Sequence, residues 1–365
     1  MKRIFFITSE FPPLPGGIGN HAYHLALALV KQGYTVLVLT DQRSANLSQD
    51  LAFDASLPFQ VQRIPRSRFV FWTYWQRVYQ AVRLGKQYHA ETVILSGKFS
   101  LWLGGMLTLL YAPFTLAVIH GSELKAGGFM SRFFTRWSLS RFTKVVAVSR
   151  FTAELVHQVK SHLPLRVINN GFAMEKVSFV QRNPEPLRLV TVGNVTYRKG
   201  QQNVIRALPL LALHYPSVHY DIVGLPTEQK AFSVLAQSLG VSERVTFHGA
   251  LDASSLRKVL EQSTLFMMLS DQLQNGDVEG FGIAVLEANS MGIPALGSQN
   301  SGIADAITTG CNGVLVPPHH PESILAAVSQ VLQDYEGYQQ RAIAWSERFR
   351  WDDIVLQYLE CLKHE

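Results

Sequence analysis

Apolar residues fall into short runs, each followed by a longer stretch in which apolar positions recur with helical spacing. The runs predict strands at residues 4–7, 35–39, 92–95, 116–119, 145–148, 187–192, 219–223, 245–247, 265–268 and 295–296. Helical spacing predicts helices at residues 20–32, 201–214, 227–239, 254–261 and 283–291. Strands that alternate with helices form parallel sheets covered by helices on both faces. We therefore predict an α/β protein with two doubly wound, Rossmann-like domains that face each other across a cleft.

The boundary between the two domains is predicted near Asn169-Asn170-Gly171, a turn signal. Residues 1–170 carry 19 Lys and Arg against 7 Asp and Glu, whereas residues 171–365 carry 14 against 20. This change of charge favours an anionic partner on the first domain only. In doubly wound sheets, ligands bind beyond the carboxyl ends of the strands, which is where we look for chemistry.

The composition excludes several classes of protein. With 365 residues, 47% hydrophobic and 16% charged, the chain is too apolar to be disordered. Its two cysteines, Cys311 and Cys361, exclude a disulfide framework and a cysteine zinc site, so we expect a reducing compartment. The apolar run at residues 4–7 is too short for a signal peptide. Pro113 divides the long apolar stretch at residues 99–119, which predicts a helix and a strand instead of a membrane span.

The stretch from Glu279 to Glu287 carries the most specific chemical signal. Gly280 and Gly282 allow a tight turn into a helix that starts at Ile283, and the free N–H groups at a helix start bind phosphates. Glu287 follows Glu279 by eight residues, or about 12 Å at the helical rise of about 1.5 Å per residue. A carboxylate at that place suits a vicinal diol such as that of ribose. Two solvated glutamates are the alternative, but apolar neighbours make an unpaired Glu287 costly.

Two further groups of residues follow predicted strands. Arg198 and Lys199 come after the strand at 187–192 and could neutralise a diphosphate leaving group; the alternative is an ordinary charged loop before a helix. In the first half, His120 follows the strand at 116–119 and could face a substrate, although a lone histidine is more often structural.

A dinucleotide-binding fingerprint offers a competing interpretation. Gly17, Gly19 and Ala22 fit the pattern GxGxxA, and Asp41 follows Gly19 by 22 residues. The fingerprint should begin directly at the end of a strand, whereas residues 9–16, with three prolines, intervene here. An oxidoreductase that uses NAD is therefore a weaker alternative.

Taken together, these motifs resemble the family 4 glycosyltransferases, retaining enzymes with the GT-B fold of two Rossmann-like domains. The resemblance covers nearly the whole chain. It rests on Gly16-Gly17-Ile18-Gly19, Val148-Ser149, Asn169-Asn170-Gly171, Arg198-Lys199-Gly200, Glu279-Gly280-Phe281-Gly282 with Glu287, Gly292-Ile293-Pro294, Ser301-Gly302-Ile303-Ala304-Asp305 and residues 310–316.

The resemblance implies a role for each matching residue. Glu279, His120 and Lys199 would be catalytic: Glu279 would hold the donor sugar, Lys199 the diphosphate, and His120 would lie near the reacting sugar carbon. Glu287 would hold the ribose. The implied donor-binding set is Gly16, Gly17, Asn194, Arg198, Lys199, Gly280, Phe281, Gly282, Ile283 and Glu287. No metal and no cofactor are implied. Residues 1–170 would form the acceptor side and residues 171–350 the nucleotide-sugar domain, with the helix at 351–365 packed back on the first domain.

Two positions depart from the family's pattern. Asn194 stands where the family usually has arginine, which removes a strong diphosphate contact for which Arg198 could compensate. Asp305 stands where glutamate is more usual, at a position that helps to order the donor loop.

Basic and aromatic residues are interleaved in two segments of the first half, residues 63–83 and 129–150. The aromatic residues are Phe69, Phe71, Trp72, Tyr74, Trp75, Tyr79, Phe133, Phe134, Trp137 and Phe142. This mixture suits an anionic membrane surface. It could also bind single-stranded nucleic acid, or it could reflect a core with solvated cations. The resemblance favours the membrane, and we expect no nucleic-acid partner.

The sequence as a whole predicts a retaining, metal-independent glycosyltransferase that moves a hexose from a nucleotide-diphosphate sugar, of the UDP-glucose type, to a saccharide or lipid-linked acceptor. It would be cytoplasmic and peripheral at the inner face of the membrane. A sugar-nucleotide epimerase or hydrolase of the same fold and the NAD-dependent oxidoreductase are the alternatives.

Overall fold

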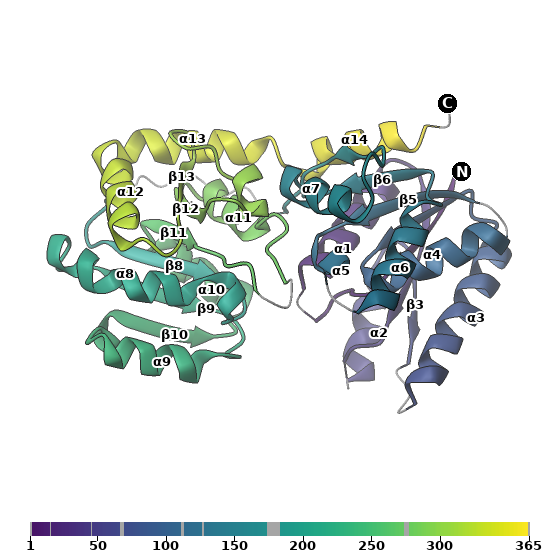
Figure 1. Ribbon diagram of the computed structural model, residues 1–365, viewed down its shortest axis with the longest axis horizontal. Coiled ribbons are helices and arrows are strands. Elements are labelled where there is room, and N and C mark those ends of the chain that lie inside the picture. Colours follow the sequence, from purple (N-terminus) through teal and green to yellow (C-terminus); the bar gives the residue numbers. More distant parts are fainter. Residues whose placement is uncertain are drawn as a thin grey trace. The chain divides into compact units, whose positions relative to one another are not determined.

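A computed structural model describes residues 2–14, 16–44, 46–65, 69–110, 113–125, 128–173, 183–273 and 277–363. The chain divides into two compact units. The first contains Met1–Gly171 and Trp351–Glu365, and the second contains Phe172–Arg350. Each unit has its own sheet, and both sheets are parallel (Figure 1).

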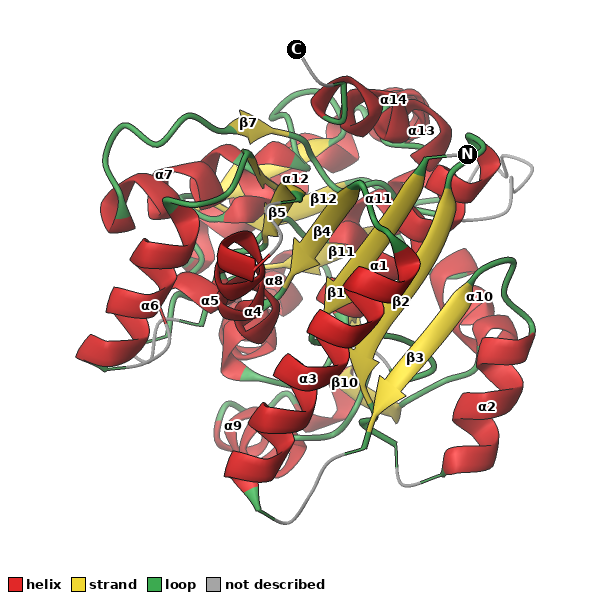
Figure 2. Ribbon diagram, turned by 90° about the vertical axis from the view of Figure 1, so that its right-hand side faces the viewer, coloured by secondary structure: helices red, strands yellow, loops and turns green. Residues whose placement is uncertain are grey.

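The first unit has a seven-stranded sheet in the order β3-β2-β1-β4-β5-β6-β7. Figure 2 shows β1, β2 and β3 pointing the same way, as their parallel registers require. The strands are β1 (Arg3–Thr8), β2 (Thr35–Asp41), β3 (Gln60–Ile64), β4 (Thr92–Ser96), β5 (Phe114–Ile119), β6 (Lys144–Ala147) and β7 (Arg166–Val167). The helices are α1 (Gly17–Lys31), α2 (Leu47–Ala55), α3 (Val70–Tyr88), α4 (Lys98–Leu110), α5 (Ser122–Lys125), α6 (Phe129–Leu139) and α7 (Arg150–Val159).

The second unit has a six-stranded sheet in the order β10-β9-β8-β11-β12-β13. Its strands are β8 (Arg188–Val192), β9 (His219–Val223), β10 (Val245–Gly249), β11 (Leu265–Met268), β12 (Ala295–Ser298) and β13 (Gly313–Val316). Its helices are α8 (Gln201–His214), α9 (Gln229–Ser238), α10 (Ala253–Glu261), α11 (Ile283–Ser290), α12 (Pro321–Gln333) and α13 (Tyr335–Glu347), with short 3₁₀ turns η1 (Tyr197–Lys199), η2 (Ser242–Arg244) and η3 (Gly302–Asp305).

Helix α14 (Trp351–Cys361) belongs to the first unit although it follows the second unit in sequence. It contacts α1, and its Tyr358 hydroxyl lies 3.0 Å from Nε2 of His21. The Trp351 side chain lies so close to Gly171 that a Cβ there would come within 2.6 Å of the indole. The segments that enter and leave the second unit therefore lie next to each other on the first unit's side.

The buried strands explain why the fold could be predicted from apolar runs. All five residues of β4 are buried, as are five of the six in β5, and such strands of parallel sheets have continuous apolar sequences. Pro113 does separate a helix, α4, from a strand, β5. The sequence missed β3 because this edge strand alternates exposed and half-buried residues (QVQRI) and buries only Ile64. Among the described residues, no helix combines the length and the apolar character needed to cross a membrane.

Candidate functional site

The carboxyl end of β8 brings Lys199 into the second unit's candidate site. Gly193 follows β8 with a φ of 148°, and a Cβ there would lie 3.0 Å from Cε of Lys199. The Lys199 side chain therefore passes directly over the backbone at the strand end. Gly200, with a φ of 79°, lets this loop approach the neighbouring segment, because a Cβ there would lie 1.8 Å from the carbonyl oxygen of Leu269. The local glycines thus fix the path of the lysine.

The Glu279 carboxylate forms ion pairs with both cations of this loop. Its Oε2 lies 2.8 Å from Nζ of Lys199 and also pairs with the Arg198 guanidinium. Arg198 has a second carboxylate partner, since its Nε lies 3.2 Å from Oδ2 of Asp277. Burial on its own would raise the pKa of Glu279, but the charges of Lys199 and Arg198 and their hydrogen bonds lower it to about 2. The carboxylate is therefore ionised and fully neutralised by its neighbours.

The start of α11 lies directly after this cluster. Gly282 is the N-cap residue, with a φ of 88°, and no side chain caps the helix, so N–H groups at the helix start are available for an anion. A second backbone segment supports the loop. The N–H of Gly302 donates to the Glu279 carbonyl at 3.1 Å, and a Cβ at Gly302 would lie 2.0 Å from the Gly280 oxygen.

Glu287 lies one helical turn further along α11 and is half-buried. Burial raises the pKa of its carboxyl group, an effect that the charge of Lys199 reduces. Within the described part of the chain, no hydrogen bond or ion pair is formed by this carboxylate. The expected separation of about 12 Å from Glu279 assumed a helical rise over all eight residues, whereas α11 begins only at Ile283, so the helical rise applies only to the last part of that stretch.

The two departures from the family pattern have different surroundings. Asn194 is exposed, and its backbone carbonyl accepts a hydrogen bond from Nε2 of Gln201 at 3.1 Å. Arg198 reaches Glu279 and Asp277 from four residues away, so a guanidinium is present at this edge of the sheet. Asp305 is half-buried at the last residue of η3, which begins at Gly302.

The first unit places His120 at the end of β5, where it is 8% exposed. Its Nε2 lies 3.0 Å from Oγ of Ser96 at the end of β4, and its backbone N–H donates to Oε1 of the buried Glu123 at 2.8 Å. Burial lowers the pKa of His120 to about 3. The ring is therefore neutral at physiological pH and is held in one orientation.

His120 has a second histidine beside it, whereas the sequence suggested a lone one. The ring of His21, on α1, lies edge-on to it with centroids 4.9 Å apart. His21 is fully buried, and burial lowers its pKa well below the usual range, with further contributions from His120 and His24. The sequence did not indicate His21, Ser96 or Glu123 as site residues. Ser96 and Glu123 could have been found from their positions beside strand ends, whereas no such signal marks His21.

Gly16 and Gly17 form the start of α1. Gly16 is the N-cap residue, and no side chain caps this helix. A Cβ at Gly16 would lie 2.2 Å from Oε2 of Glu10, so the Glu10 side chain would have to move to make room for it. Gly17 to Ala22 are all helical, and residues 9–16 separate them from β1. Because β1 ends at Thr8 and α1 begins at Gly17, the strand does not turn directly into the helix, which argues against the oxidoreductase alternative.

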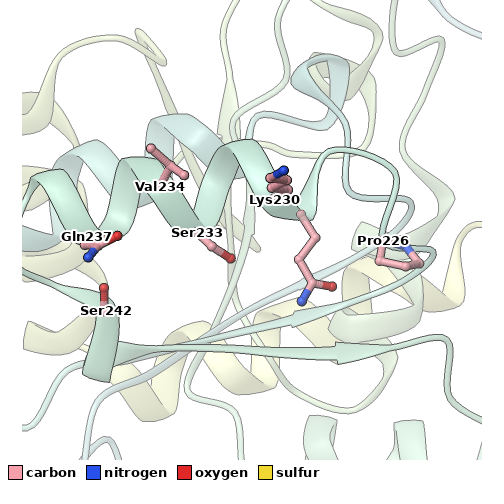
Figure 3. A pocket seen from close by; sticks show the side chains of 7 residues that line it. Pro226, Lys230, Ser233, Val234, Gln237 and Ser242 are labelled. Atoms are coloured by element: carbon pink, nitrogen blue, oxygen red, sulfur yellow. The ribbon is translucent and has the colours of Figure 1, made fainter.

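Two other features do not contribute to these clusters. The described residues contain no group of three His, Cys, Asp or Glu side chains arranged to hold a metal ion. A groove of about 640 Å³ runs along α9, where Lys230, Ser233 and Gln237 line it together with Ser242 (Figure 3). None of the candidate donor-binding residues lines this groove.

Comparison with known proteins identifies the family. Residues 15–176 match the family model described as Glycosyltransferase Family 4, and residues 174–347 match the one described as Glycosyl transferases group 1. The chain belongs to the family 4 glycosyltransferases. The resemblance inferred from its motifs is confirmed, and the chain is a transferase enzyme.

Curated relatives align with this glycosyltransferase over almost its full length. Glycogen synthase of Mycobacterium tuberculosis is 26% identical over 390 residues, which cover 97% of this chain and 92% of the relative. A GDP-mannose-dependent alpha-(1-6)-phosphatidylinositol monomannoside mannosyltransferase of the same species is 25% identical and covers 100% of this chain and 98% of the relative.

Solved structures confirm the GT-B fold of the glycosyltransferase. Sucrose-phosphate synthase of Thermosynechococcus elongatus superposes with a TM-score of 0.82 at 19% identity, over 99% of this chain and 98% of the other. Anabaena HepE in complex with UDP and glucose superposes with a TM-score of 0.78 at 19% identity, over 99% of both chains.

Proposed function

We propose that this glycosyltransferase moves a hexose from a nucleotide-diphosphate sugar to a lipid-linked or polysaccharide acceptor, with retention of the anomeric configuration and without a metal ion. The observation that carries the proposal is the second unit's cluster. Two cations, Arg198 and Lys199, a buried carboxylate and an uncapped helix start gather at one edge of the sheet, and Glu287 lies one turn further on.

The donor would bind along this cluster, in the nucleotide-sugar domain at residues 171–350. The diphosphate would contact Lys199, Arg198 and the backbone N–H groups at Gly280, Phe281, Gly282 and Ile283, which together offer positive charge and donors. The Glu287 carboxylate, which has no hydrogen-bond or ion-pair partner among the described residues, would accept hydrogen bonds from the ribose hydroxyls. Glu279 would hold the sugar, and the exposed Asn194 would contribute a neutral contact.

The chemical step would be the departure of the nucleoside diphosphate. Negative charge develops on the leaving phosphate oxygen, and fixed donors directed at such charge lower the barrier. Lys199 and Arg198 supply the charge that a metal ion would otherwise provide. The acceptor hydroxyl would attack from the face that the leaving group occupies, which preserves the anomeric configuration. Glu279→Ala would therefore mainly lower turnover.

The first unit would provide the acceptor side. Gly16 and Gly17 begin α1 with uncapped N–H groups suited to a donor phosphate. His120 would contact a donor hydroxyl near the reacting carbon. Because its pKa is about 3, it would act as a neutral hydrogen-bonding group and not as an acid.

We also propose that an anionic membrane surface binds the first unit, which would make the protein cytoplasmic and peripheral. Trp72 and Trp75 are 49% and 48% exposed on α3 and stack with centroids 5.0 Å apart, and the ring of Tyr79 continues the stack at 5.3 Å. On α6, Met130 and Phe133 are also exposed. Both helices pack against α4 (Figure 1).

Exposed cations lie on the same two helices as these rings. Arg83 lies 5.9 Å from the Tyr79 ring centroid, and Arg132 and Arg136 are exposed on α6. Exposed aromatic rings beside arginines suit the interfacial region of an anionic bilayer. By contrast, Phe142 is buried, so part of the second basic and aromatic segment belongs to the core. Phe71 lies among residues whose side chains are outside the described set.

The donor base and sugar are proposed as UDP and glucose. The support is a protein of the same fold, Anabaena HepE, which has been crystallised with UDP-glucose. The mannosyltransferase relative depends on GDP-mannose, so GDP-mannose is the second candidate.

Calorimetry with UDP, GDP, ADP and NAD, each in the presence of EDTA, tests the donor site. We expect UDP or GDP to bind and NAD not to bind. Absence of binding by every nucleoside diphosphate, or a requirement for a divalent ion, would refute the corresponding part of the proposal. NMR of the anomeric proton in the product then distinguishes retention from inversion, and product formation without any acceptor would favour a hydrolase.

Sedimentation with vesicles tests the membrane surface. The double variant Trp72→Ala/Trp75→Ala should bind vesicles of phosphatidylglycerol and phosphatidylcholine at least about tenfold more weakly than wild type. Leu213→Ala is the matched control, because Leu213 is 79% exposed on α8 of the second unit. Equal binding by all three proteins would exclude α3 as the docking surface.

A further inference from the structure

The carboxylate of Glu279 occupies the position that a bound anion would take. Lys199 lies 2.8 Å from it, and Arg198 pairs with the same oxygen. Both are the cations to which the proposed function assigns the diphosphate. A diphosphate carries at least two negative charges and cannot share these cations with a carboxylate at hydrogen-bond distance without strong repulsion.

We propose that Glu279 is the residue that distinguishes an intact sugar donor from the free nucleoside diphosphate, because donor binding transfers its carboxylate from the two cations to the hydroxyl groups of the sugar. This inference rests on the proposed function and assigns a specificity to the same site. The exchange keeps the number of charge-assisted hydrogen bonds nearly constant when a sugar is present, since sugar hydroxyls donate to the displaced carboxylate.

Free nucleoside diphosphate cannot complete that exchange. Its phosphates compete for Lys199 and Arg198, but it has no sugar hydroxyls for the displaced Glu279. The carboxylate side chain is only 12% exposed, so water replaces the lost partners poorly, and a buried unpaired charge is costly. Glu279 therefore penalises the product nucleotide and favours its release after each transfer.

The backbone at Glu279 is held in place, so the carboxylate can return to the same position after each transfer. The Glu279 carbonyl is fixed by the N–H of Gly302 at 3.1 Å, so the backbone stays in place while the side chain changes partner. Asp277 also pairs with Arg198, at 3.2 Å, but its side chain is 42% exposed. Water can solvate Asp277 when Arg198 turns to a phosphate, which makes it a matched control.

Calorimetry with UDP and UDP-glucose on wild type, Glu279→Gln and Asp277→Asn tests the inference. Glutamine keeps the size of the side chain and removes its charge. We expect UDP to bind Glu279→Gln about tenfold more tightly than wild type, because one like charge near the diphosphate is removed. UDP-glucose should gain less or lose affinity, and Asp277→Asn should change the UDP affinity less than about threefold.

The outcomes separate this inference from the proposed function. If wild type binds neither compound, and neither GDP nor GDP-mannose, the proposed donor site is wrong. If wild type binds both, and Glu279→Gln binds UDP no more tightly, only the selectivity assigned to Glu279 is overturned. An equal gain in Asp277→Asn would also overturn it, because the effect would then be the general charge of the loop.

A crystal structure of wild type with UDP-glucose tests the exchange without any variant. We expect the Glu279 carboxylate to lie on a sugar hydroxyl and, unlike its present distance of 2.8 Å, beyond hydrogen-bond reach of Nζ of Lys199. An ion pair between Glu279 and Lys199 that persists beside the bound donor would overturn the inference.

Discussion

Gly302 lies very close to the backbone of Glu279 and Gly280. The substitution Gly302→Ala therefore tests how precisely this backbone must be positioned. A Cβ at Gly302 would lie 2.0 Å from the Gly280 oxygen and 2.6 Å from the Glu279 oxygen, whereas ordinary contacts begin at 3.4 Å. The two backbone segments must therefore separate by about 1.4 Å, the difference between 3.4 and 2.0 Å. No positive φ is involved at Gly302, so the effect is steric alone.

A displacement of this size has a defined expected cost. Misplacing a catalytic group by about 1 Å lowers turnover by about 100-fold, and overpacking destabilises a protein by about 1–3 kcal/mol. We therefore expect kcat to fall by about two orders of magnitude and the melting temperature to fall by roughly 2–4 °C for each kcal/mol lost. The protein should remain folded at 25 °C.

Steady-state kinetics with the donor selected by the binding panel, together with a melting curve, provides the measurement. Gly128→Ala is the control, since Gly128 has a φ of −70° and nothing lies within 4 Å of a Cβ there. A Gly302→Ala enzyme with kcat within about twofold of wild type would show that the loop tolerates this displacement, and the reasoning about its backbone would be refuted.

Three further predictions follow from the same structure. Glu287→Gln should weaken UDP binding by about 10–100-fold in calorimetry, because hydrogen bonds to a charged group contribute about 1.5–3 kcal/mol. Since the pKa of Glu287 is raised by burial, wild-type affinity should be full above that pKa and fall as the pH decreases through it, whereas the glutamine variant should not show this dependence. The His120 ring, with a pKa of about 3, should show no NMR titration between pH 5 and 8. Asp221→Ala should lower the stability of the second unit by about 2–4 kcal/mol in urea unfolding, because this 1% exposed carboxylate pairs at 2.8 Å with both Arg188 and His248.

The proximity of Arg198, Lys199 and Glu279 could be predicted from sequence because these residues are tied to local motifs. Glu279 precedes the loop that leads into α11, Glu287 lies within that helix, and Arg198 and Lys199 follow a strand whose apolar run is clear. Parallel strands place such loops at the same edge, so the motifs imply proximity before any coordinates are known. The pairing within the cluster, in which the carboxylate neutralises both cations, depends on side-chain positions that no motif specifies.

The residues around His120 could not be predicted, because they come from separate elements and belong to no local motif. Ser96, His21 and Tyr358 lie on separate elements, and His21 and Tyr358 are 337 residues apart. No periodicity or spacing links them, and only the packing of α14 on α1 brings the last two together. The aromatic segments were equally ambiguous, because exposed and buried rings have the same composition. Trp75 is half exposed whereas Phe142 is 9% exposed, a difference that depends on tertiary structure.

The return of α14 to the first unit has a consequence for biosynthesis. Trp351 follows Gly171 by 180 residues, so at about 5–20 residues per second a ribosome needs roughly 10–40 s to make the intervening segment. During that interval the nascent first unit lacks Trp351 and Tyr358, and the surface of α1 that they cover remains available to chaperones. The second unit, although made later, emerges with all its strands and helices before the first is complete. The order of folding is thus expected to run against the order of synthesis.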